Sequence, residues 1–458
     1  MNPPTANAKG ERVVTAPRSA QIYGMALLNP PREVLEIAAK LRDNGFETWC
    51  VGGAVRDALL GHAHLDWDLA TSATPPEVMR LFKRTVPVGL AFGTVGVLDR
   101  HGRLHEVTTF RLDVNTDGRH AEVQFGASLD EDLARRDFTI NAMAYDPQTG
   151  ELRDPFRGRK DLGQGLLRCV GDAEQRMKED RLRALRALRF ASRFGFEIEP
   201  ATWKAICNSA PHLVRLSAER VKQEIDKTME QVARPSVAFA RWREAGALLV
   251  LVPHLQAAPF SRFAALDYLP MPGPAGRPQR KLLRLAMLFF GDHRSAAEPA
   301  LKALKFSNAD TAWILRLADA RALLGAAVDA AMLRGGDAGG ATDAELRRWA
   351  AYVGRTAAAG WWRLHAALWS ARRATGGAAP SVRAVHSTHR RLVRIAYRDP
   401  MTIADLQVDG DDLVAAGVKA GPALGSTLKR LLEAVIDDPS LNQRATLLAL
   451  AVKMHKPL

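Results

Sequence analysis

The stretch WCVGGAVRDALLGHAHLDWDLATSA, residues 49–73, combines a glycine turn, a predicted helix and a predicted strand that carries two aspartates. Side chains alternate along a strand with a period of two, so Asp66 and Asp68 on either side of Trp67 are predicted to face the same side. Two neighbouring carboxylates repel each other, and a divalent cation bound by both offsets this repulsion. Mg²⁺ suits the pattern because it accepts one or two carboxylates, several waters and substrate phosphates. The stretch therefore predicts a metal site.

The glycine turn adds a predicted nucleotide site. Gly52 and Gly53 permit a tight turn and close approach of a ligand to the backbone. They precede the predicted helix VRDALLG, whose N-terminal amides can receive a phosphate, and Arg56 in its first turn carries a guanidinium that suits phosphate oxygens. Taken alone, the two glycines also suit a plain turn, and an Asp-x-Asp pattern also occurs by chance. The two patterns together indicate a nucleotide and metal site more specifically than either does alone.

GGAVRD followed by an acidic pair on a predicted strand resembles the polymerase β superfamily of nucleotidyltransferases, and in particular the class II tRNA nucleotidyltransferases and bacterial poly(A) polymerases. The resemblance is strong over about residues 45–260 and weaker beyond. It implies an α+β fold, in which an N-terminal nucleotidyltransferase palm with a small mixed β-sheet precedes an all-helical neck, body and tail. The domains expected are a disordered N-terminus at 1–20, the palm at 21–150, the neck with the nucleotide-selecting helix at 151–230, the body at 231–370 and a tRNA-binding tail at 371–458.

Composition indicates a basic chain of several domains. Its 458 residues carry a formal net charge of +14, which favours an acidic partner such as nucleic acid, although an Arg-rich soluble surface is an alternative. The three cysteines lack the spacing of a zinc site or disulfide framework. No apolar run has the length of a membrane span, and the N-terminus lacks the apolar segment of a signal peptide. We therefore expect a cytoplasmic protein.

The runs GTVGVLD and RLHEVTTFR predict a β-hairpin, and Glu106 lies in its second strand. Glu106 is either the third carboxylate of a two-metal site or a solvated strand residue, and the sequence leaves both open. The turn-rich segment DVNTDGRHAEVQFG that follows predicts a mobile loop over the site, with an ordinary hairpin connection as the alternative.

The segment RRDFTINAMAYD also matches a motif of the resembled family. The resemblance implies that Arg136 contacts the bound nucleotide and that Asp137 supports the site. Without it, the two residues would be interpreted as a surface salt-bridge element.

EDRLRALRALRF predicts a helix on which Asp180 and Arg183 lie one turn apart on one face. Cytosine and adenine both place an amino donor beside a ring-nitrogen acceptor, so an aspartate and an arginine together match CTP and ATP and reject GTP and UTP. The segment resembles the family's nucleotide-selecting motif, and the resemblance extends to Arg186 and Arg189 as further nucleotide contacts.

Two features of the predicted helical part have two interpretations each. Arg220 and Lys222 either touch RNA backbone or belong to a structural neck helix, which we favour. The tryptophans of WWRLHAALWSARR either stack on bases or pack in a core, and their helical spacing favours the core. The tail helix opening at GPALG resembles the family's tail, and its free amides, with Lys429 and Arg430, are predicted to hold tRNA phosphate.

Together these features imply addition of C, C and A to the 3′ end of tRNA from CTP and ATP, with Mg²⁺ held by Asp66 and Asp68, with tRNA as partner and with no membrane and no stable protein partner. Poly(A) polymerase is the nearest alternative. VPVGLAFGTVGVLD with EVTTFR resembles the tRNA enzymes instead, and no Gly followed by two basic residues and Phe occurs. An enzyme that adds adenosine alone stays open. A non-catalytic RNA-binding protein is expected to have lost an aspartate, and both are present.

Overall fold

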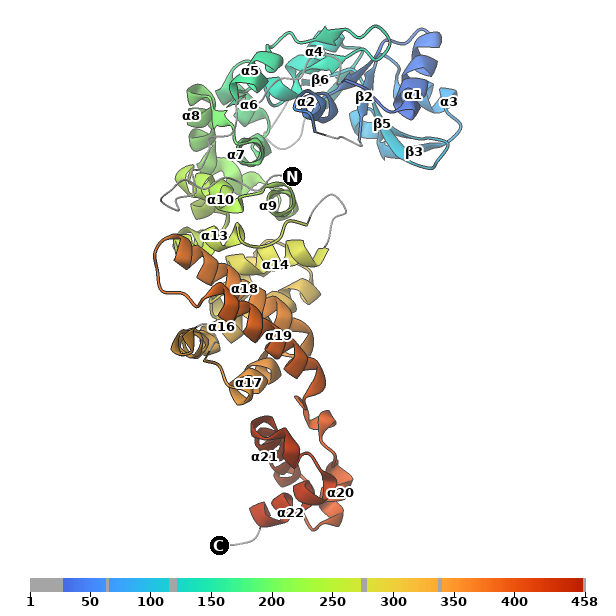
Figure 1. The fold of residues 1–458 in the computed structure, drawn as a ribbon. Coiled ribbons are helices and arrows are strands. Elements are labelled where there is room, and N and C mark those ends of the chain that lie inside the picture. Colours follow the sequence, from blue (N-terminus) through green and yellow to red (C-terminus); the bar gives the residue numbers. More distant parts are fainter. Residues whose placement is uncertain (1–27, 63–65, 115–121, 273–277, 337–339, 456–458) are drawn as a thin grey trace. The chain divides into compact units, whose positions relative to one another are not determined.

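The computed structural model describes residues 28–62, 66–114, 122–272, 278–336 and 340–455 (Figure 1). The chain forms two compact units. The first extends to Glu224 and includes Arg241–Leu251, and the second holds Ile225–Ala240 and Val252–Leu458. The domain boundaries expected at residues 150, 230 and 370 stay predictions, and the expected disordered segment 1–20 lies outside the described residues.

A seven-stranded mixed sheet forms the centre of the first unit, with the strand order β3-β4-β5-β2-β1-β8-β9. Only β2 and β5 pair in parallel; the other neighbours are antiparallel. β4 and β5 form the predicted hairpin. The strands are β1 (Thr48–Val51), β2 (Asp68–Thr71), β3 (Thr85–Gly89), β4 (Thr94–Leu98), β5 (Leu104–Thr109), β8 (Ala144–Tyr145) and β9 (Leu152–Arg153).

Two small sheets accompany the large one. β6 (Arg111–Val114) and β7 (Glu122–Phe125) form an antiparallel pair, while β10 (Leu166–Leu167) pairs in parallel with β11 (Glu197–Ile198). The centre of the loop predicted to cover the site, residues 115–121, lies outside the described residues.

The central strands β1 and β2 are buried along almost their whole length, and helices pack against them. Trp49, Val51 and Ala70 on one face pack with Leu129 and Leu133. The helices of this region are α1 (Arg32–Asp43), α2 (Gly53–Leu59), α3 (Pro75–Leu81) and α4 (Leu129–Ala134).

Capping residues define where two of these helices begin. α3 begins after Thr74 and α4 after Ser128, each in a capping box with a glutamate three residues later. Ser128 and Thr74 therefore fix the first turns of α4 and α3.

The rest of the first unit is mainly helical. Figure 1 shows it in green, following the sheet along the chain. It contains α5 (Gly158–Gln164), α6 (Ala173–Glu179), α7 (Leu182–Phe194), α8 (Pro200–Ser209) and α11 (Ala247–Leu251), while the residues of α9 (Ala218–Gln231) and α10 (Pro235–Glu244) are divided between the two units.

The second unit is helical throughout the part of the chain that the structure describes. It contains α12 (Pro253–Gln256), α13 (Phe260–Leu266), α14 (Pro278–Leu288), α15 (Arg294–Ala303), α16 (Asn308–Arg334), α17 (Asp343–Val353), α18 (Arg355–Ala374), α19 (Val382–Arg398), α20 (Gly410–Ala415), α21 (Pro422–Asp437) and α22 (Arg444–His455). The last three helices enclose a core of their own, which includes Leu413, Leu431, Val435 and Leu447. The expected fold class, an N-terminal mixed sheet followed by helical domains, is confirmed.

The tryptophans of α18 lie in a core. Trp361, Trp362 and Trp369 are each at most 1% exposed, and the Trp362 indole donates to the carbonyl of Val385 at 3.1 Å. Core packing is confirmed over base stacking for these residues. No described helix is long and apolar enough to cross a membrane.

Candidate active site

The two aspartates of the opening stretch lie on one side of the chain, as predicted. Asp66 and Asp68 are both exposed, whereas Trp67 between them is 4% exposed. The predicted strand is shorter than expected, because β2 begins only at Asp68 and Asp66 precedes it. Asp66 therefore lies in the irregular segment that leads into β2.

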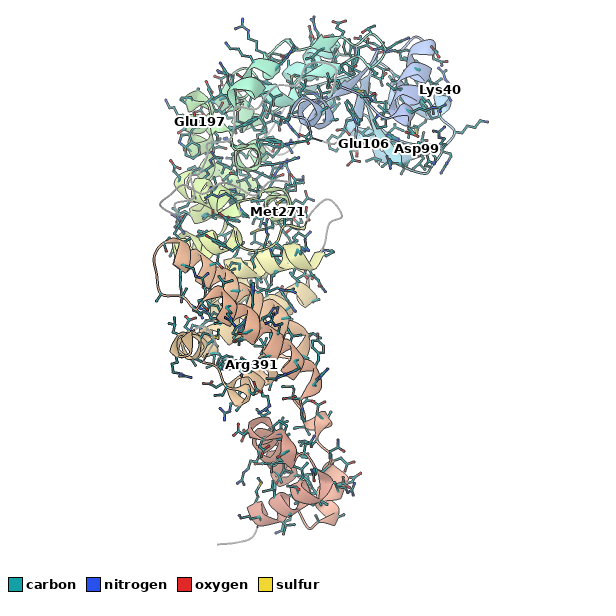
Figure 2. The ribbon with its side chains drawn as sticks, viewed as in Figure 1. Lys40, Asp99, Glu106, Glu197, Met271 and Arg391 are labelled. Carbon is teal, nitrogen blue, oxygen red and sulfur yellow. The ribbon has the colours of Figure 1, made fainter. Side chains whose placement is uncertain are left out.

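Strand pairing places Glu106 beside Asp68. Leu69 and Val107 are partners in the parallel β2–β5 ladder, so the residues just before them, Asp68 and Glu106, are neighbours on the same face. Glu106 is exposed on β5, opposite Gly96 of β4, and Figure 2 labels it on this part of the sheet. The sheet thus adds to the aspartates a carboxylate that lies some forty residues away in the sequence.

Asp68 has a strongly perturbed pKa. Surrounding protein atoms desolvate its carboxylate in part although the side chain is open to solvent, and this raises the pKa from 3.8 to about 6. The negative charges of Glu106 and Asp66 raise it further, and the positive charge of Arg136 lowers it. These four groups therefore lie within electrostatic reach of one another.

The glycine turn lies next to this cluster. Val51 pairs with Asp68 across β1 and β2, and Gly52 follows directly. Gly52 has φ +73° and forms the N-cap of α2, and a Cβ built on it would lie 2.8 Å from Nη1 of Arg136. A side chain here would strain the backbone at this positive φ, which favours glycine, and it would displace the end of the Arg136 side chain. Gly53 follows as the first residue of α2.

The guanidinium of Arg136 has one nitrogen with a hydrogen-bond partner and one without. Its Nη2 donates to Asp132 at 3.1 Å, while its Nε is buried without a hydrogen-bond partner in the described part of the chain. An unsatisfied buried N–H is costly, and an anionic ligand would satisfy it. The predicted contact between Arg136 and a nucleotide stays a prediction, which this geometry favours.

Arg56 differs from the expectation of a phosphate ligand. It is 4% exposed, and its guanidinium donates to Asp57 at 2.7 Å and to the side-chain oxygen of Asn141. The rings of Phe190 and Phe194 lie 5.1 Å and 4.8 Å from it. These contacts connect α2 to α7 and leave little surface for a phosphate.

The structure contradicts the continuous helix predicted over EDRLRALRALRF. α6 ends at Glu179, Asp180 is extended with φ −147°, and α7 begins at Leu182. The carboxylate of Asp180 accepts the Leu182 amide at 3.0 Å, so it caps the new helix. An aspartate favours such a break because its short side chain bonds nearby backbone amides.

Asp180 and Arg183 also have separate partners. Arg220 donates to both carboxylate oxygens of Asp180, at 3.0 and 2.8 Å. Arg183 donates to Glu179 at 2.7 Å and to the Arg135 carbonyl at 3.0 Å. The two predicted base-reading residues are therefore adjacent in one turn, but each is paired elsewhere.

Arg186 and Arg189 anchor α7 to its surroundings. Arg186 forms a bond of 2.7 Å to Asp137, whose pKa is lowered to about 2 because this positive charge and the Asn141 amide outweigh the effect of burial. Arg189 is 3% exposed and pairs with Glu224 at 2.7 Å. Asp137 is thus bound to Arg186, and its support of the site stays a prediction, whereas the contacts of Arg189 are those of a buried pair.

Several of these partners were missed in the sequence. Asp57, Asn141, Glu179 and Glu224 received no role there, although each binds an arginine that did. Only the short pairs, such as Glu179 and Arg183 four residues apart, leave a local signal. The longer pairs depend on how the elements pack.

The donors fit a divalent cation of the magnesium type. Carboxylates that repel one another on one face would be stabilised by it. Throughout residues 28–455, apart from the segments not described, no three His, Cys, Asp or Glu side chains are spaced to hold an ion by themselves. Mg²⁺ needs only one or two carboxylates when water and phosphate complete its shell, so the site fits this ion better than a fully enclosed one.

Three family models match the chain. Residues 48–168 match a poly A polymerase head domain, residues 195–258 match a probable RNA and SrmB-binding site of polymerase A, and residues 372–451 match a putative tRNA nucleotidyltransferase domain 2.

Curated relatives are similar over the N-terminal half. The CCA-adding enzyme of Leuconostoc mesenteroides is 48% identical over 210 residues, which are 45% of this chain and 52% of that protein. The CCA-adding enzyme of Geobacillus stearothermophilus is 45% identical over 205 residues, 44% of this chain and 50% of that protein. The match thus spans about half the length of these relatives.

Solved structures are similar over almost the whole chain. The Bacillus stearothermophilus CCA-adding enzyme in complex with CTP is 32% identical, covers 92% of this chain and 97% of its own, and has a TM-score of 0.71. The Thermotoga maritima CCA-adding enzyme complexed with tRNA shares the fold, with 20% identity, coverage of 95% and 98%, and a TM-score of 0.64.

Sheet, carboxylates and glycine turn together define a nucleotidyltransferase palm of the polymerase β type, to which helical domains are attached. The similarity to the CTP-bound structure extends this class over 92% of the chain. The chain belongs to the family of class II CCA-adding tRNA nucleotidyltransferases and bacterial poly(A) polymerases.

Proposed function

We propose that this protein is an enzyme that adds C, C and A to the 3′ end of tRNA without a nucleic-acid template, using CTP and ATP. The observation that carries the proposal is the group of three carboxylates, Asp66, Asp68 and Glu106, next to Gly52 and Arg136. The similarity to CCA-adding enzymes, and the charge of +14, support tRNA as the substrate.

Each group has a role in this transfer. Asp66 and Asp68 hold the divalent cation, which we propose to be Mg²⁺ and which supplies activation of the RNA 3′ hydroxyl and charge stabilisation at the triphosphate. Glu106 is the third carboxylate. Gly52, Gly53 and Arg136 hold phosphate or sugar, because the turn permits close approach and the buried Nε of Arg136 needs an acceptor. Arg56 acts by fixing α2 against α7.

Asp180 and Arg183 are proposed to read the base. Asp180 accepts a hydrogen bond from the amino group of cytosine or adenine, and Arg183 donates one to the ring nitrogen. In this structure Arg220 is paired with the carboxylate of Asp180. A bound base must therefore share that carboxylate with Arg220 or displace Arg220 from it. Arg186 and Arg189 hold the reading helix in place rather than touch the nucleotide.

Poly(A) polymerase is the second candidate, because two of the matching family models carry that name. The same carboxylates would then extend an RNA with adenylate. An enzyme that adds only the terminal adenosine and a non-catalytic RNA-binding protein are further alternatives.

The test uses purified protein with tRNA lacking its 3′ end, with tRNA ending in CC and with an oligoadenylate, each with CTP, ATP or both. Addition limited to completing CCA supports the proposal, and long adenylate tails on any RNA assign the protein to the poly(A) polymerases instead. Absence of incorporation at every Mg²⁺ and Mn²⁺ concentration favours the binding-only alternative.

Partners and location follow from this activity. We propose tRNA, CTP and ATP as the ligands, no stable protein partner and no membrane, and a location in the cytoplasm where tRNA is processed. On α21 the amides that follow Gly421, together with Lys429 and Arg430, remain the proposed tRNA contact of the tail.

A further inference from the structure

A pocket outside the site described above lies on α5 of the first unit. It has a volume of about 270 Å³ and is lined by Phe156, Arg157, Lys160, Asp161, Gln164 and Arg168. Three of these side chains are cationic and one is a carboxylate. Phe156 supplies an aromatic wall, and it also packs against the core of the palm. The chemistry of the lining is that of a site for an anion with an attached apolar or aromatic group.

The carboxylate does not cancel the positive charge at the mouth of the pocket. The side chain of Asp161 is 5% exposed, and it accepts from the Thr139 hydroxyl at 2.7 Å and from Nε of Arg168 at 3.1 Å. Arg168 also reaches Glu199 at 3.3 Å. Asp161 and Arg168 are therefore paired with each other within the lining, with Asp161 buried and the Arg168 side chain 42% exposed.

The other two cations are free for a ligand. Arg157 and Lys160 are exposed, and neither side chain has a hydrogen-bonding or ionic partner in the part of the chain that the structure describes. Arg157 is also one of two described non-glycine residues with positive φ, at 59°. A non-glycine residue in this conformation is strained, and such strain is found at ligand-binding positions. Here it sets the direction in which the arginine leaves the backbone.

The pocket is joined to the segment that carries Arg136. Thr139 binds Asp161 at 2.7 Å, and its backbone amide donates to the Arg168 carbonyl at 3.0 Å. A Cβ on Gly158 would lie 2.1 Å from the Thr139 carbonyl oxygen, so α5 packs on this segment without space for a side chain. This side of the pocket is closely packed, while Arg157 and Lys160 are exposed to solvent.

We propose that this pocket binds a backbone phosphate of the RNA substrate, with Arg157 and Lys160 as the phosphate ligands and Phe156 beside the adjoining nucleoside. The inference rests on the proposed function and names one place where the RNA is held. A rim of exposed cations suits a polyanion that passes over the surface, because arginine and lysine contribute to phosphate binding by charge and counterion release. A free phosphate or pyrophosphate shares this chemistry, and the experiment separates the two.

Lys160→Ala and Arg159→Ala form a matched pair for the test. Both remove one exposed positive charge from α5, but only Lys160 lines the pocket. Arg157→Gly is the second pocket variant, and it keeps the fold because glycine adopts positive φ freely. Thermal unfolding of each full-length variant verifies folding.

Binding of tRNA is measured by filter retention or fluorescence anisotropy at several salt concentrations. We expect each pocket variant to weaken binding about threefold to tenfold and to reduce the slope of log K against log salt by about 1, whereas Arg159→Ala changes the slope less. The KM for tRNA should rise more than the KM for CTP. If Lys160→Ala and Arg159→Ala change the affinity for tRNA and its salt dependence equally, the inference is overturned.

Inorganic phosphate and pyrophosphate are titrated in parallel in thermal-shift measurements without RNA. If either ligand stabilises the wild type but not Lys160→Ala, while tRNA binding is the same in both, the pocket is a free-anion site and the RNA assignment is wrong. Failure of the wild type to extend tRNA would instead reject the proposed function, whatever the variants do. Extension of tRNA by the wild type, with unchanged binding by both pocket variants, would reject the pocket alone.

Discussion

Replacing Asp68 with asparagine is expected to stabilise the metal-free protein while it abolishes metal-dependent activity. Burial and the charges of Glu106 and Asp66 raise the Asp68 pKa from 3.8 to about 6, which means that the fold disfavours the ionised carboxylate. A difference of this size corresponds to about 3 kcal/mol. Because Asp68 is open to solvent, screening reduces that value, and we expect about 1 kcal/mol.

The sign of the pH dependence follows from the raised pKa. Below 3.8 the carboxyl is protonated in both the folded and unfolded states, and the variant gains nothing from losing the charge. As the pH rises from 3.8 to about 6, the unfolded state ionises first, and the wild type loses stability relative to the variant. Above pH 6 the advantage of the variant is complete.

The assay is thermal unfolding in EDTA, at about pH 8 and at about pH 4.5, of wild type and Asp68→Asn. For a unit of this size, about 1 kcal/mol corresponds to about 2–4 °C in Tm, so the variant should melt higher by that amount at the higher pH and by less at the lower. Excess Mg²⁺ should raise the Tm of the wild type more than that of the variant. An Asp68→Asn Tm equal to or below that of the wild type at pH 8 would refute the electrostatic reasoning.

Asp99→Asn is a control of opposite sign. The Asp99 pKa is lowered to about 2, since hydrogen bonds from His105 and from the backbone amides of Arg103 and His101 outweigh the effect of burial. Its ionised form therefore stabilises the fold at neutral pH, and this stability is lost as the pH falls from 3.8 toward 2. Asp99→Asn should lower the Tm at pH 8, in contrast to Asp68→Asn.

Glu106→Gln should slow nucleotide transfer at least about tenfold with CTP affinity nearly unchanged, as kcat and equilibrium binding would report, and near-normal turnover would remove Glu106 from the site. Gly52→Ala should raise the KM for CTP because the new Cβ displaces Arg136, and far-ultraviolet circular dichroism should show the fold retained; an unaltered KM would contradict the contact. Glu224→Gln, which leaves the buried Arg189 charge without its counter-charge, should cost about 3–5 kcal/mol in urea unfolding, and a cost under about 1 kcal/mol would show that the pair is not buried in solution.

The sequence predicts best where the signal is local. The alternating exposure of Asp66, Trp67 and Asp68, the hairpin of β4 and β5 and the Ser128 cap all follow from patterns within about ten residues, and the structure has them. It predicts poorly where a local pattern has two outcomes. The periodicity of EDRLRALRALRF suits a continuous helix, but Asp180 caps α7 and breaks it.

The sequence by itself determined the acidic pair, the glycine turn and the β4–β5 hairpin, because alternation and turn formation depend on neighbouring residues. Its resemblance to a known family implied the palm and the helical remainder. Only the tertiary structure decided that Glu106 lies beside Asp68, that Arg136 lies against Gly52, and that Arg56 is a buried cation between α2 and α7. These arrangements depend on strand register and on helix packing, which bring together residues far apart in the chain. The sequence contains no local signal that distinguishes an arginine that binds a phosphate from one that binds a buried carboxylate. The packing around the arginine determines which of the two it binds.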